Sequence, residues 1–355
     1  MKAISLAFLL TSFCIGVVHA QEKGKISLLA YADYFYNIAR DTVALSNSVL
    51  KGSEAHQAFQ FRRIYFTYDY ALDTNVATRF RLEADQSALT SDGKIGVFVK
   101  DAFVRWKKAF GENDLIFGIQ PTPAFEVSEE FWSYRSLEKT IMDLRGVVGS
   151  RDFGIALKGS VADGEVGYWL LIGNGSGNQP EANKLKRYYG HVRFQPVSNV
   201  DLTVYADFNP RPDVPNPYTG FTVSNPTTTA AVYLGFRAIE MLKIGFEGLM
   251  QRTPNAYDNG TSLEDQSGVG ISVFARLSIS GNLEAVARFD HYDPNTAGSA
   301  VGDVRQYILG GLAITAAGNV RVIPNIQVET YESGPAGGKF ESSVTGRITI
   351  AWSLP

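Results

Sequence analysis

The side chains best able to do chemistry in this sequence are arginines, lysines and carboxylates that recur at every second position of short segments. In residues 74–85, Arg79, Arg81, Glu83 and Asp85 alternate with apolar residues. A charged face opposite an apolar face is typical of a β-strand that exposes one face to water. Rings of Arg and Lys around a water-filled passage favour anions. These residues are therefore better suited to selecting solutes by charge than to catalysing a reaction.

Nucleophilic, acid–base and metal chemistry have much less support. Beyond residue 20 the histidines are His56, His191 and His291, and no serine sits in a nucleophile-elbow motif. The only cysteine, Cys14, lies in a segment that we expect to be removed, which excludes disulfides and thiolate metal sites. The glycine-rich stretch at 173–177 is not followed by a helical pattern, so it is no phosphate-binding loop. We expect no catalytic residue, no metal site and no cofactor.

The first twenty residues predict an export signal. Lys2 precedes an apolar run from Leu6 to Val18, and the small-residue ending predicts cleavage after Ala20. The run is too short for a membrane-spanning helix. Residues 21–355 are then expected to form a single domain. Its net charge is small and its basic residues are dispersed, so we expect no nucleic-acid partner.

Alternation with a period of two recurs from residue 25 to the end, and helical patterns are nearly absent. The fold predicted is all-β, a transmembrane antiparallel up-and-down β-barrel of about sixteen strands. We place the strands at residues 25–38, 58–71, 74–86, 94–108, 112–121, 151–162, 164–174, 185–196, 199–209, 228–239, 241–252, 267–279, 282–292, 304–316, 319–331 and 341–353.

The links between these strands sort by parity. Tight turns follow even-numbered strands, and longer polar links follow odd-numbered ones, as at 39–57, 122–150, 209–227 and 253–266. Short turns on one rim and long loops on the other are the layout of an outer-membrane barrel, with the short turns facing the periplasm. Closure is required because lipid cannot satisfy an open strand edge. About sixteen strands leave an aqueous channel, whereas eight fill themselves.

Inward parity on the strands carries slightly more basic than acidic residues, which predicts a preference for anions. The alternative, that these are solvated and mutually paired wall residues, stays open for each one. The basic residues chosen as pore-lining are Arg63, Arg79, Arg81, Arg105, Lys107, Lys158, Arg187 and Arg193. Arg62 next to Arg63 is ambiguous, since strict alternation sends one of the two outward.

The long link 122–150 between the fifth and sixth strands is the candidate constriction loop, folded inward. Its mixed charges would set up a transverse field across the narrowest point. They are Arg135, Lys139, Arg145, Arg151, Glu129 and Glu130.

Some apolar residues fall at inward parity against the pattern. Either a folded-in loop covers part of the wall, or a bulge shifts the register by one. They are Phe103, Trp169, Leu171, Leu249, Phe274, Val286, Leu309 and Ile323.

Four stretches resemble the phosphate-selective porin O/P family of outer-membrane general and anion porins. They are FQFRRI at 59–64, RFRLEAD at 79–85, RDFGI at 151–155 and YWLLIGNG at 168–175. Barrels of this class usually end in an aromatic residue, whereas here Trp352 is followed by Ser353, Leu354 and Pro355. The resemblance implies a sixteen-stranded, trimeric channel for anions, phosphate or polyphosphate. It carries over no phosphate-binding residue, because the loop does not match residue by residue.

The function predicted is an outer-membrane porin, a passive diffusion channel for small hydrophilic solutes that prefers anions. Its partners would be outer-membrane lipid, such solutes and two further copies in a homotrimer, in the bacterial outer membrane. Two alternatives remain. One is a surface adhesin or structural barrel without transport. The other is an outer-membrane barrel hydrolase, which would need a Ser or Asp with a nearby His base.

Overall fold

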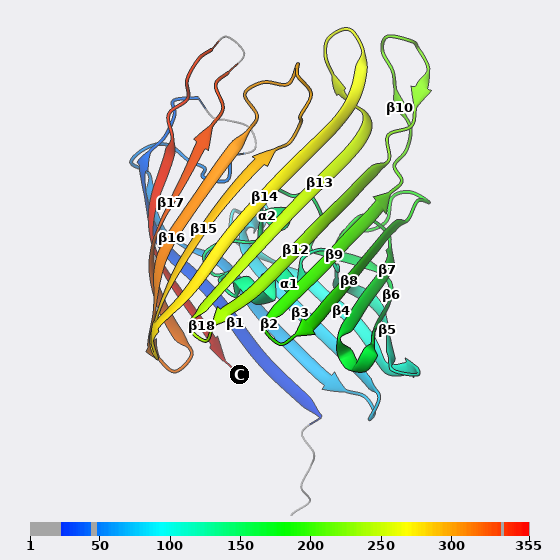
Figure 1. Cartoon of the computed structure of the whole chain (residues 1–355), viewed down its shortest axis with the longest axis vertical. Helices are drawn as coiled ribbons and strands as arrows, with labels where there is room; N and C mark the ends of the chain where they lie inside the picture. Colours follow the sequence, from blue (N-terminus) through cyan, green and yellow to red (C-terminus); the bar gives the residue numbers. More distant parts are fainter. Residues whose placement is uncertain (1–22, 44–47, 335–336, 355) are drawn as a thin grey trace, which may run out of the picture.

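The computed structural model describes residues 23–43, 48–334 and 337–354, and these form a closed antiparallel barrel of sixteen strands (Figure 1). Each strand pairs with its sequence neighbours in the barrel, and β1 pairs with β18 to close it. Closure leaves no strand edge for lipid to satisfy. The predicted fold class is confirmed. The predicted export signal lies outside the described residues.

The barrel strands are β1 (Gly24–Ala39), β2 (Gln57–Ala71), β3 (Val76–Leu89), β4 (Ile95–Phe110), β5 (Asn113–Pro121), β6 (Arg151–Val161), β7 (Val166–Gly173), β8 (Arg187–Val197), β9 (Val200–Asn209), β12 (Thr227–Ile239), β13 (Leu242–Asp258), β14 (Leu263–Ser280), β15 (Leu283–Asp293), β16 (Arg305–Ala317), β17 (Val320–Tyr331) and β18 (Ser343–Leu354). The remaining elements are α1 (Glu126–Trp132), α2 (Ile141–Leu144), the 3-10 turn η1 (Ala162–Gly164) and the small hairpin β10 (Val214–Pro215) with β11 (Thr222–Val223). Neither α-helix in the described chain has the length and apolar character needed to cross a bilayer.

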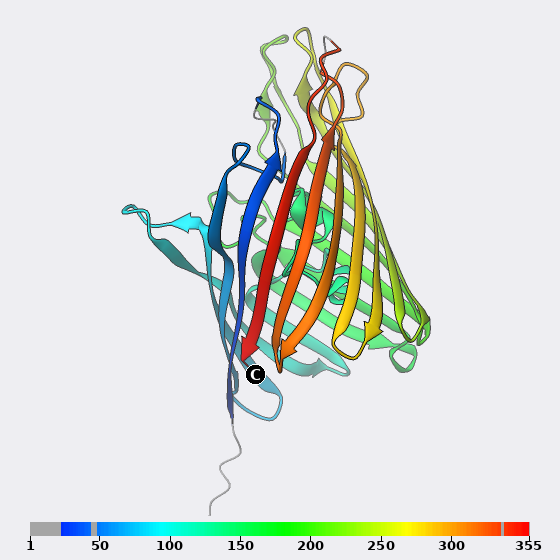
Figure 2. The same cartoon turned by 90° about the vertical axis from the view of Figure 1, so that its left-hand side faces the viewer.

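The two rims differ as the sequence predicts. Tight links such as 72–75, 240–241 and 318–319 lie at the rim that also holds the C-terminal end of β18, which we call the short-turn rim (Figure 1). The longer links gather at the opposite, long-loop rim (Figures 1 and 2). The expected loop at residues 253–266 is wrong. The β13–β14 ladder runs on to the Asp258–Leu263 pair, so most of residues 253–266 is strand rather than loop.

Burial alternates along the strands with a period of two. In β9, Val204 is 55% exposed on the outer wall, while the next residue, Tyr205, is 2% exposed inside. Outward rows carry exposed valine, isoleucine, leucine and phenylalanine around the whole barrel. Apolar surface of this extent is stable only against hydrocarbon.

Two strand bulges turn pairs of adjacent charged residues inward together. Tyr31 pairs with Arg63 and Ala32 with Phe61, which leaves Arg62 as the extra residue of β2. Arg62 and Arg63 both bind carboxylates of the interior, those of Asp33 and Glu83. The expectation that one of the two arginines points outward is therefore wrong, because a bulge suspends strict alternation.

A second bulge produces the same result on β4. Arg81 pairs with Asp101 and Leu82 with Val99, so Lys100 is the extra residue. Its ammonium lies 2.8 Å from the Glu83 carboxylate inside the barrel.

The lipid-facing wall can be tested at Val204, halfway along β9 on the exposed outer row. Replacing Val204 by Arg should lower the free energy of unfolding by about 2–4 kcal/mol, because a charge at mid-bilayer depth is poorly solvated. The measurement is denaturant unfolding of protein folded into lipid vesicles, with Val204→Leu as the control. Equal stability of the two variants would place Val204 away from hydrocarbon.

Candidate functional site

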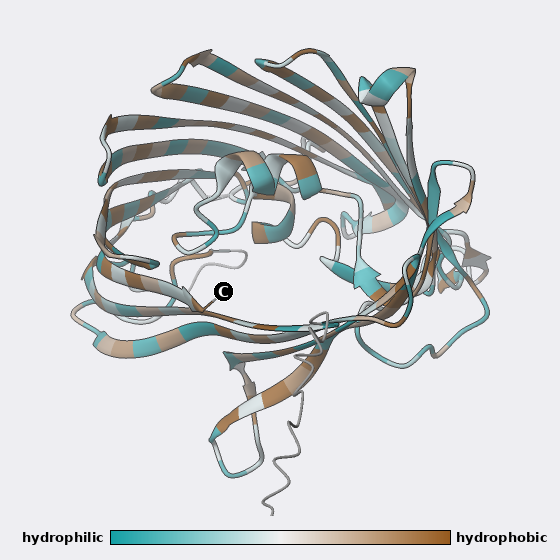
Figure 3. Cartoon of the chain, turned by 90° about the horizontal axis from the view of Figure 1, so that it is seen from below, coloured by the Kyte–Doolittle hydropathy of each residue, from teal (hydrophilic) through white to brown (hydrophobic). Residues whose placement is uncertain are grey.

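Residues 122–150, which join β5 to β6 and carry α1 and α2, lie inside the barrel (Figure 3). We call them the internal segment. Wall side chains hold its backbone carbonyls from several directions. Arg62 donates to the Leu137 carbonyl at 3.0 Å, Arg276 to Phe131 at 2.9 Å and Gln251 to Val147 at 2.9 Å. Contacts on strands β2, β13 and β14 fix the segment across the lumen.

Apolar packing holds the same segment against part of the wall. Trp132 is fully buried, with its ring 5.1 Å from Phe274 and 5.8 Å from Tyr134. Phe131 packs against Tyr233 and Phe274. A second cluster joins Ile141, Met142 and neighbouring segment residues to the walls of β5–β9 and β13.

These clusters explain the apolar residues at inward parity. Of the two explanations left open, coverage by a folded-in segment is the one observed, and at these apolar positions no register shift is needed. The residues buried in the clusters are Trp169, Leu171, Leu249, Phe274, Val286, Leu309 and Ile323, and Phe103 packs against them partly exposed.

The wall formed by β1–β3 contributes no residue to either apolar cluster and is charged instead. The Glu83 carboxylate binds Arg63 at 2.6 Å and Lys100 at 2.8 Å, and the Arg81 guanidinium lies 3.2 Å from Asp101. The guanidiniums of Arg63 and Arg81 also lie over the ring of Tyr65. A polar wall facing the charged side of the internal segment is where water and ions have favourable partners.

Most of the predicted pore-lining cations are paired with carboxylates. The pairs are Arg63–Glu83, Arg79–Asp69, Arg81–Asp101, Arg105–Asp114, Lys158–Glu126, Arg187–Asp207 and Arg193–Asp201. Lys107 is the exception, with no ion pair to any described residue, and it lines a cavity of about 340 Å³ at the short-turn rim. Mutual pairing of wall residues, the alternative left open by the sequence, thus applies to seven of the eight cations.

The charged residues of the internal segment form two kinds of contact. Arg135 binds Glu129 and Asp143 within the segment, and Lys139 lies 3.4 Å from Asp143. Others reach the wall, since Arg145 binds Glu329 of β17 at 2.8 Å. Arg151, which we expected in the constriction loop, is instead the first residue of β6 and pairs with Asp101 of β4. Glu130 faces a cavity lined by Arg193, Arg237, Lys243 and Arg276.

The neighbouring cations lower the pKa values of two carboxyl groups in the segment, those of Asp143 and Glu138. Burial raises the pKa of Asp143, but Arg135 and Lys139 outweigh it, and the net pKa lies below its usual range. Burial likewise raises the pKa of Glu138, and the cations Arg62 and Arg347 reverse the shift, so this pKa is lowered too.

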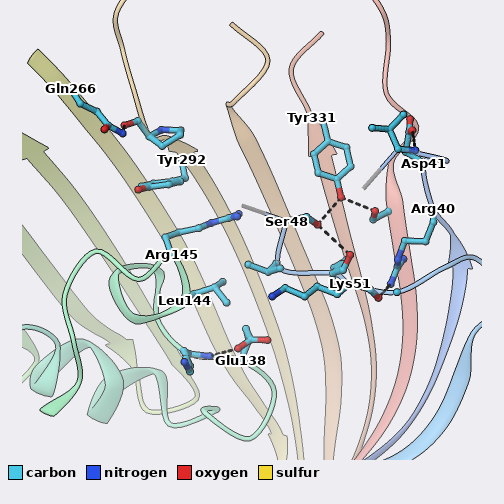
Figure 4. A pocket seen from close by; sticks show the side chains of 17 residues that line it. Arg40, Asp41, Ser48, Lys51, Glu138, Leu144, Arg145, Gln266, Tyr292 and Tyr331 are labelled. Carbon is cyan, nitrogen blue, oxygen red and sulfur yellow. Dashed lines mark hydrogen bonds between the residues drawn. The ribbon is translucent and has the colours of Figure 1, made fainter. Parts of the chain in front are cut away.

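A cavity of about 900 Å³ opens above the internal segment at the long-loop rim (Figure 4). Residues 40–43 and 48–52 contribute to its lining, and Asn37 donates to the carbonyls of Lys51 and Ser53. Tyr292 supports the guanidinium of Arg145 at 5.6 Å. Arg40, Lys51, Lys139 and Arg145 supply four cations to this cavity, against Asp41 and Glu138.

Sequence reasoning missed some of these residues. Lys100 was overlooked although it shares with Arg62 one signal, two adjacent charged residues in mid-strand. Arg40 and Lys51 lie in the first long link, where no period exists to orient them. The buried tyrosines Tyr31 and Tyr65 were passed over because polar and apolar roles of tyrosine look alike in a sequence.

The described residues hold no cluster of three or more histidines, cysteines or carboxylates able to bind a metal ion. His191, the one buried histidine on an inward row, has its Nδ1 2.9 Å from the Pro123 carbonyl and packs edge-on against Trp169. Its role is to anchor the start of the internal segment.

No protein-family model matches this sequence, and no curated protein matches it significantly. Solved structures do match its fold. The outer-membrane channel DcaP of Acinetobacter baumannii is 10% identical, with a TM-score of 0.66 over 93% of this chain and 97% of that one. The anion-selective porin from Comamonas acidovorans is 10% identical, with a TM-score of 0.62 over 93% and 99%. OmpF of Salmonella typhi is 12% identical, with a TM-score of 0.61 over 93% and 97%. The chain is thus similar in fold to outer-membrane porins.

The packing of the internal segment can be tested at its fully buried tryptophan. Replacing Trp132 by Ala should release the segment from the wall, because a Trp→Ala change in a packed core costs about 3–5 kcal/mol. The expected result is rapid protease cleavage within residues 122–150 while the barrel strands stay intact. Trp106→Ala, at an exposed position of the outer wall, is the matched control. Equal protection of both variants would contradict the packing described.

Acid should loosen the same segment. Asp143 and Glu138 have lowered pKa values in the folded protein, so their stabilisation is present above the unfolded-state pKa of about 4. It is lost as pH falls through the lower folded-state values. Emission from Trp132, taken as the difference between wild type and Trp132→Phe, should shift to longer wavelength reversibly below about pH 4. An unchanged difference spectrum down to pH 2 would mean that these carboxylates do not hold the segment.

Proposed function

We propose that this protein is a porin, a passive diffusion channel for small hydrophilic solutes in the bacterial outer membrane. One observation carries the proposal: a closed barrel of sixteen strands encloses a charged, solvent-accessible lumen beside the internal segment. A barrel of this size is too wide for its own wall side chains to fill. The fold likeness to outer-membrane porins supports it.

The internal segment is proposed to be the constriction. It lies inside the barrel and carries partly exposed charges of both signs, such as Lys139 and Glu129, as a constriction loop with a transverse field requires. Solutes would pass between it and the charged wall of β1–β3, where Arg81 and Lys139 keep part of their side chains exposed.

We propose a preference for anions because some cations inside the barrel form no ion pair with a described residue. Four cations on inward rows near the short-turn rim have no ion pair to a described residue: Lys25, Lys107, Lys243 and Arg321. Unpaired cations in a pore raise the local concentration of anions. Phosphate or polyphosphate as the solute, and membership of the phosphate-selective porin O/P family, stay predictions from the sequence.

We propose outer-membrane lipid as the surroundings and a homotrimer as the assembly. The continuous apolar outer wall supports the first. For the second, a trimer form is named for one protein of similar fold, OmpT of Vibrio cholerae. We propose no enzymatic role, since no described constellation pairs a nucleophile with a histidine base, and no observation favours an adhesin.

Planar-bilayer recording tests the channel proposal and its selectivity together. The refolded protein should insert with stepwise increases in conductance, and its reversal potential in a salt gradient should lie on the anion side. Changing Lys25 and Lys107 together to Glu should move that potential toward cations, because both side chains are exposed at the short-turn mouth and unpaired.

Lys94→Glu is the control, since Lys94 lies at the tip of the β3–β4 hairpin, which leans away from the barrel (Figure 2). The same charge change there should leave the potential where it was. A folded protein that produces no conductance steps would contradict the porin proposal. An unmoved potential in the Lys25/Lys107 double variant would remove those lysines from selectivity.

A further inference from the structure

Three cations stand side by side on adjacent strands near the short-turn rim. Arg237 of β12 is the direct cross-strand partner of Lys243 on β13, and Lys243 is the direct partner of Arg276 on β14. Directly opposite residues on antiparallel strands have Cβ atoms about 5 Å apart, and like charges at that spacing destabilise a sheet. A row that violates this rule inside a folded protein points to a role other than stability.

A cavity of about 140 Å³ lies between this row and the internal segment. A water molecule takes up about 30 Å³ in the liquid, so the space suits one tetrahedral oxyanion or a few waters. A fourth cation, Arg193 of β8, joins the row at the cavity, and we call these four residues the basic quartet. Glu130, Phe131 and Ser133 of the internal segment form the facing side.

The arginines of the quartet are held in place by groups of the protein. Arg193 and Arg237 both bind the buried carboxylate of Asp201, at 2.7 Å and 2.6 Å. Arg237 also lies over the ring of Phe131 at 5.0 Å. Guanidiniums fixed in this way keep further N–H donors available in a planar fork that suits oxyanions.

Arg276 ties the quartet to the internal segment. It binds Glu284 at 2.8 Å and also donates to the Phe131 carbonyl at 2.9 Å and the Ser133 hydroxyl at 2.8 Å. A ligand that contacts Arg276 therefore also contacts a residue that positions the segment.

Lys243 is the member without a fixed partner. It makes no ion pair or side-chain hydrogen bond to any described residue, although it lies between two arginines and is only partly exposed. A lysine in that position is stabilised most by an anion that bridges it to its neighbours. The exposed Glu130 is the one carboxylate of the cavity that has no ion pair within the described chain, and it would repel such an anion.

We propose that the basic quartet, Arg193, Arg237, Lys243 and Arg276, forms a binding subsite for a small oxyanion on the short-turn side of the internal segment. The inference rests on the proposed porin function and assigns to it a solute class and a place of binding. Sulfate, phosphate and carboxylate share the chemistry that the subsite would recognise: several negatively charged oxygens around a compact centre. Chloride offers no directed acceptors for the guanidinium fork, so it should bind more weakly.

Binding is measured first without conduction, by calorimetric titration of the detergent-folded protein with sodium sulfate and with inorganic phosphate in a chloride background. We expect saturable binding in the wild type and about tenfold weaker binding in Lys243→Met, which corresponds to one lost charge-assisted contact. Lys243→Arg should retain binding, because it keeps the charge. Glu130→Gln should bind more tightly, because a repelling carboxylate is gone. Lys94→Met is the matched control and should bind as the wild type does.

The location is measured next in the bilayer, with chloride carrying the current. Sulfate added on the short-turn side should reduce the chloride current at lower concentration than sulfate added on the long-loop side. That difference should disappear in Lys243→Met.

The outcomes separate the two proposals. Chloride conductance without saturable oxyanion binding, or with binding that Lys243→Met and Glu130→Gln leave unchanged, overturns the subsite and leaves the porin standing. A protein that stays silent in chloride overturns the porin, whatever the calorimeter records. If Lys243→Met fails to fold, Glu130→Gln still decides the question: tighter oxyanion binding than in the wild type supports the subsite, and unchanged binding overturns it.

Discussion

Backbone hydrogen bonding inside hydrocarbon is the constraint on which this structure depends. A strand in lipid has no water to satisfy its N–H and C=O groups, so the last strand must return to the first. The pairing of β18 with β1 meets this requirement over most of both strands. Closure then forces every strand to present one face to lipid and one to the interior, which accounts for the exposed Val204 beside the buried Tyr205.

Sixteen strands enclose more space than their own side chains can fill. In this protein the internal segment fills part of that space. Apolar patches on the inner walls of β5–β9 and β12–β17 receive that segment, while the wall of β1–β3 keeps its charges. The lumen is thereby divided into a large cavity at the long-loop rim and smaller basic cavities at the short-turn rim. Ion pairs neutralise most of the charged wall residues, and within the described chain a few inward cations near the short-turn rim have no ion pair.

The sequence was sufficient for the barrel, because a period of two is set by the pleat and needs no tertiary information. Strand limits agree to within about three residues, except that β13 and β14 continue beyond the expected turn positions. The sequence was insufficient at the bulges, because Arg62 and Lys100 are turned inward by local register shifts that a period of two does not locate, although two adjacent charged residues in mid-strand occur at both places. The sequence also does not show which charged residues form ion pairs. Whether Arg105 meets Asp114, or Lys243 meets no partner, depends on which strands adjoin and on the path of the internal segment.

The most direct test of this account is the single-channel conductance of a variant in which residues 126–144 are replaced by a short glycine–serine linker. If the internal segment narrows an otherwise open barrel, the variant should fold and show conductance steps several times larger than those of the wild type, with weaker ion selectivity. Steps of unchanged size would place the narrowest point elsewhere, and a barrel that conducts in neither form would contradict the account of a water-filled lumen.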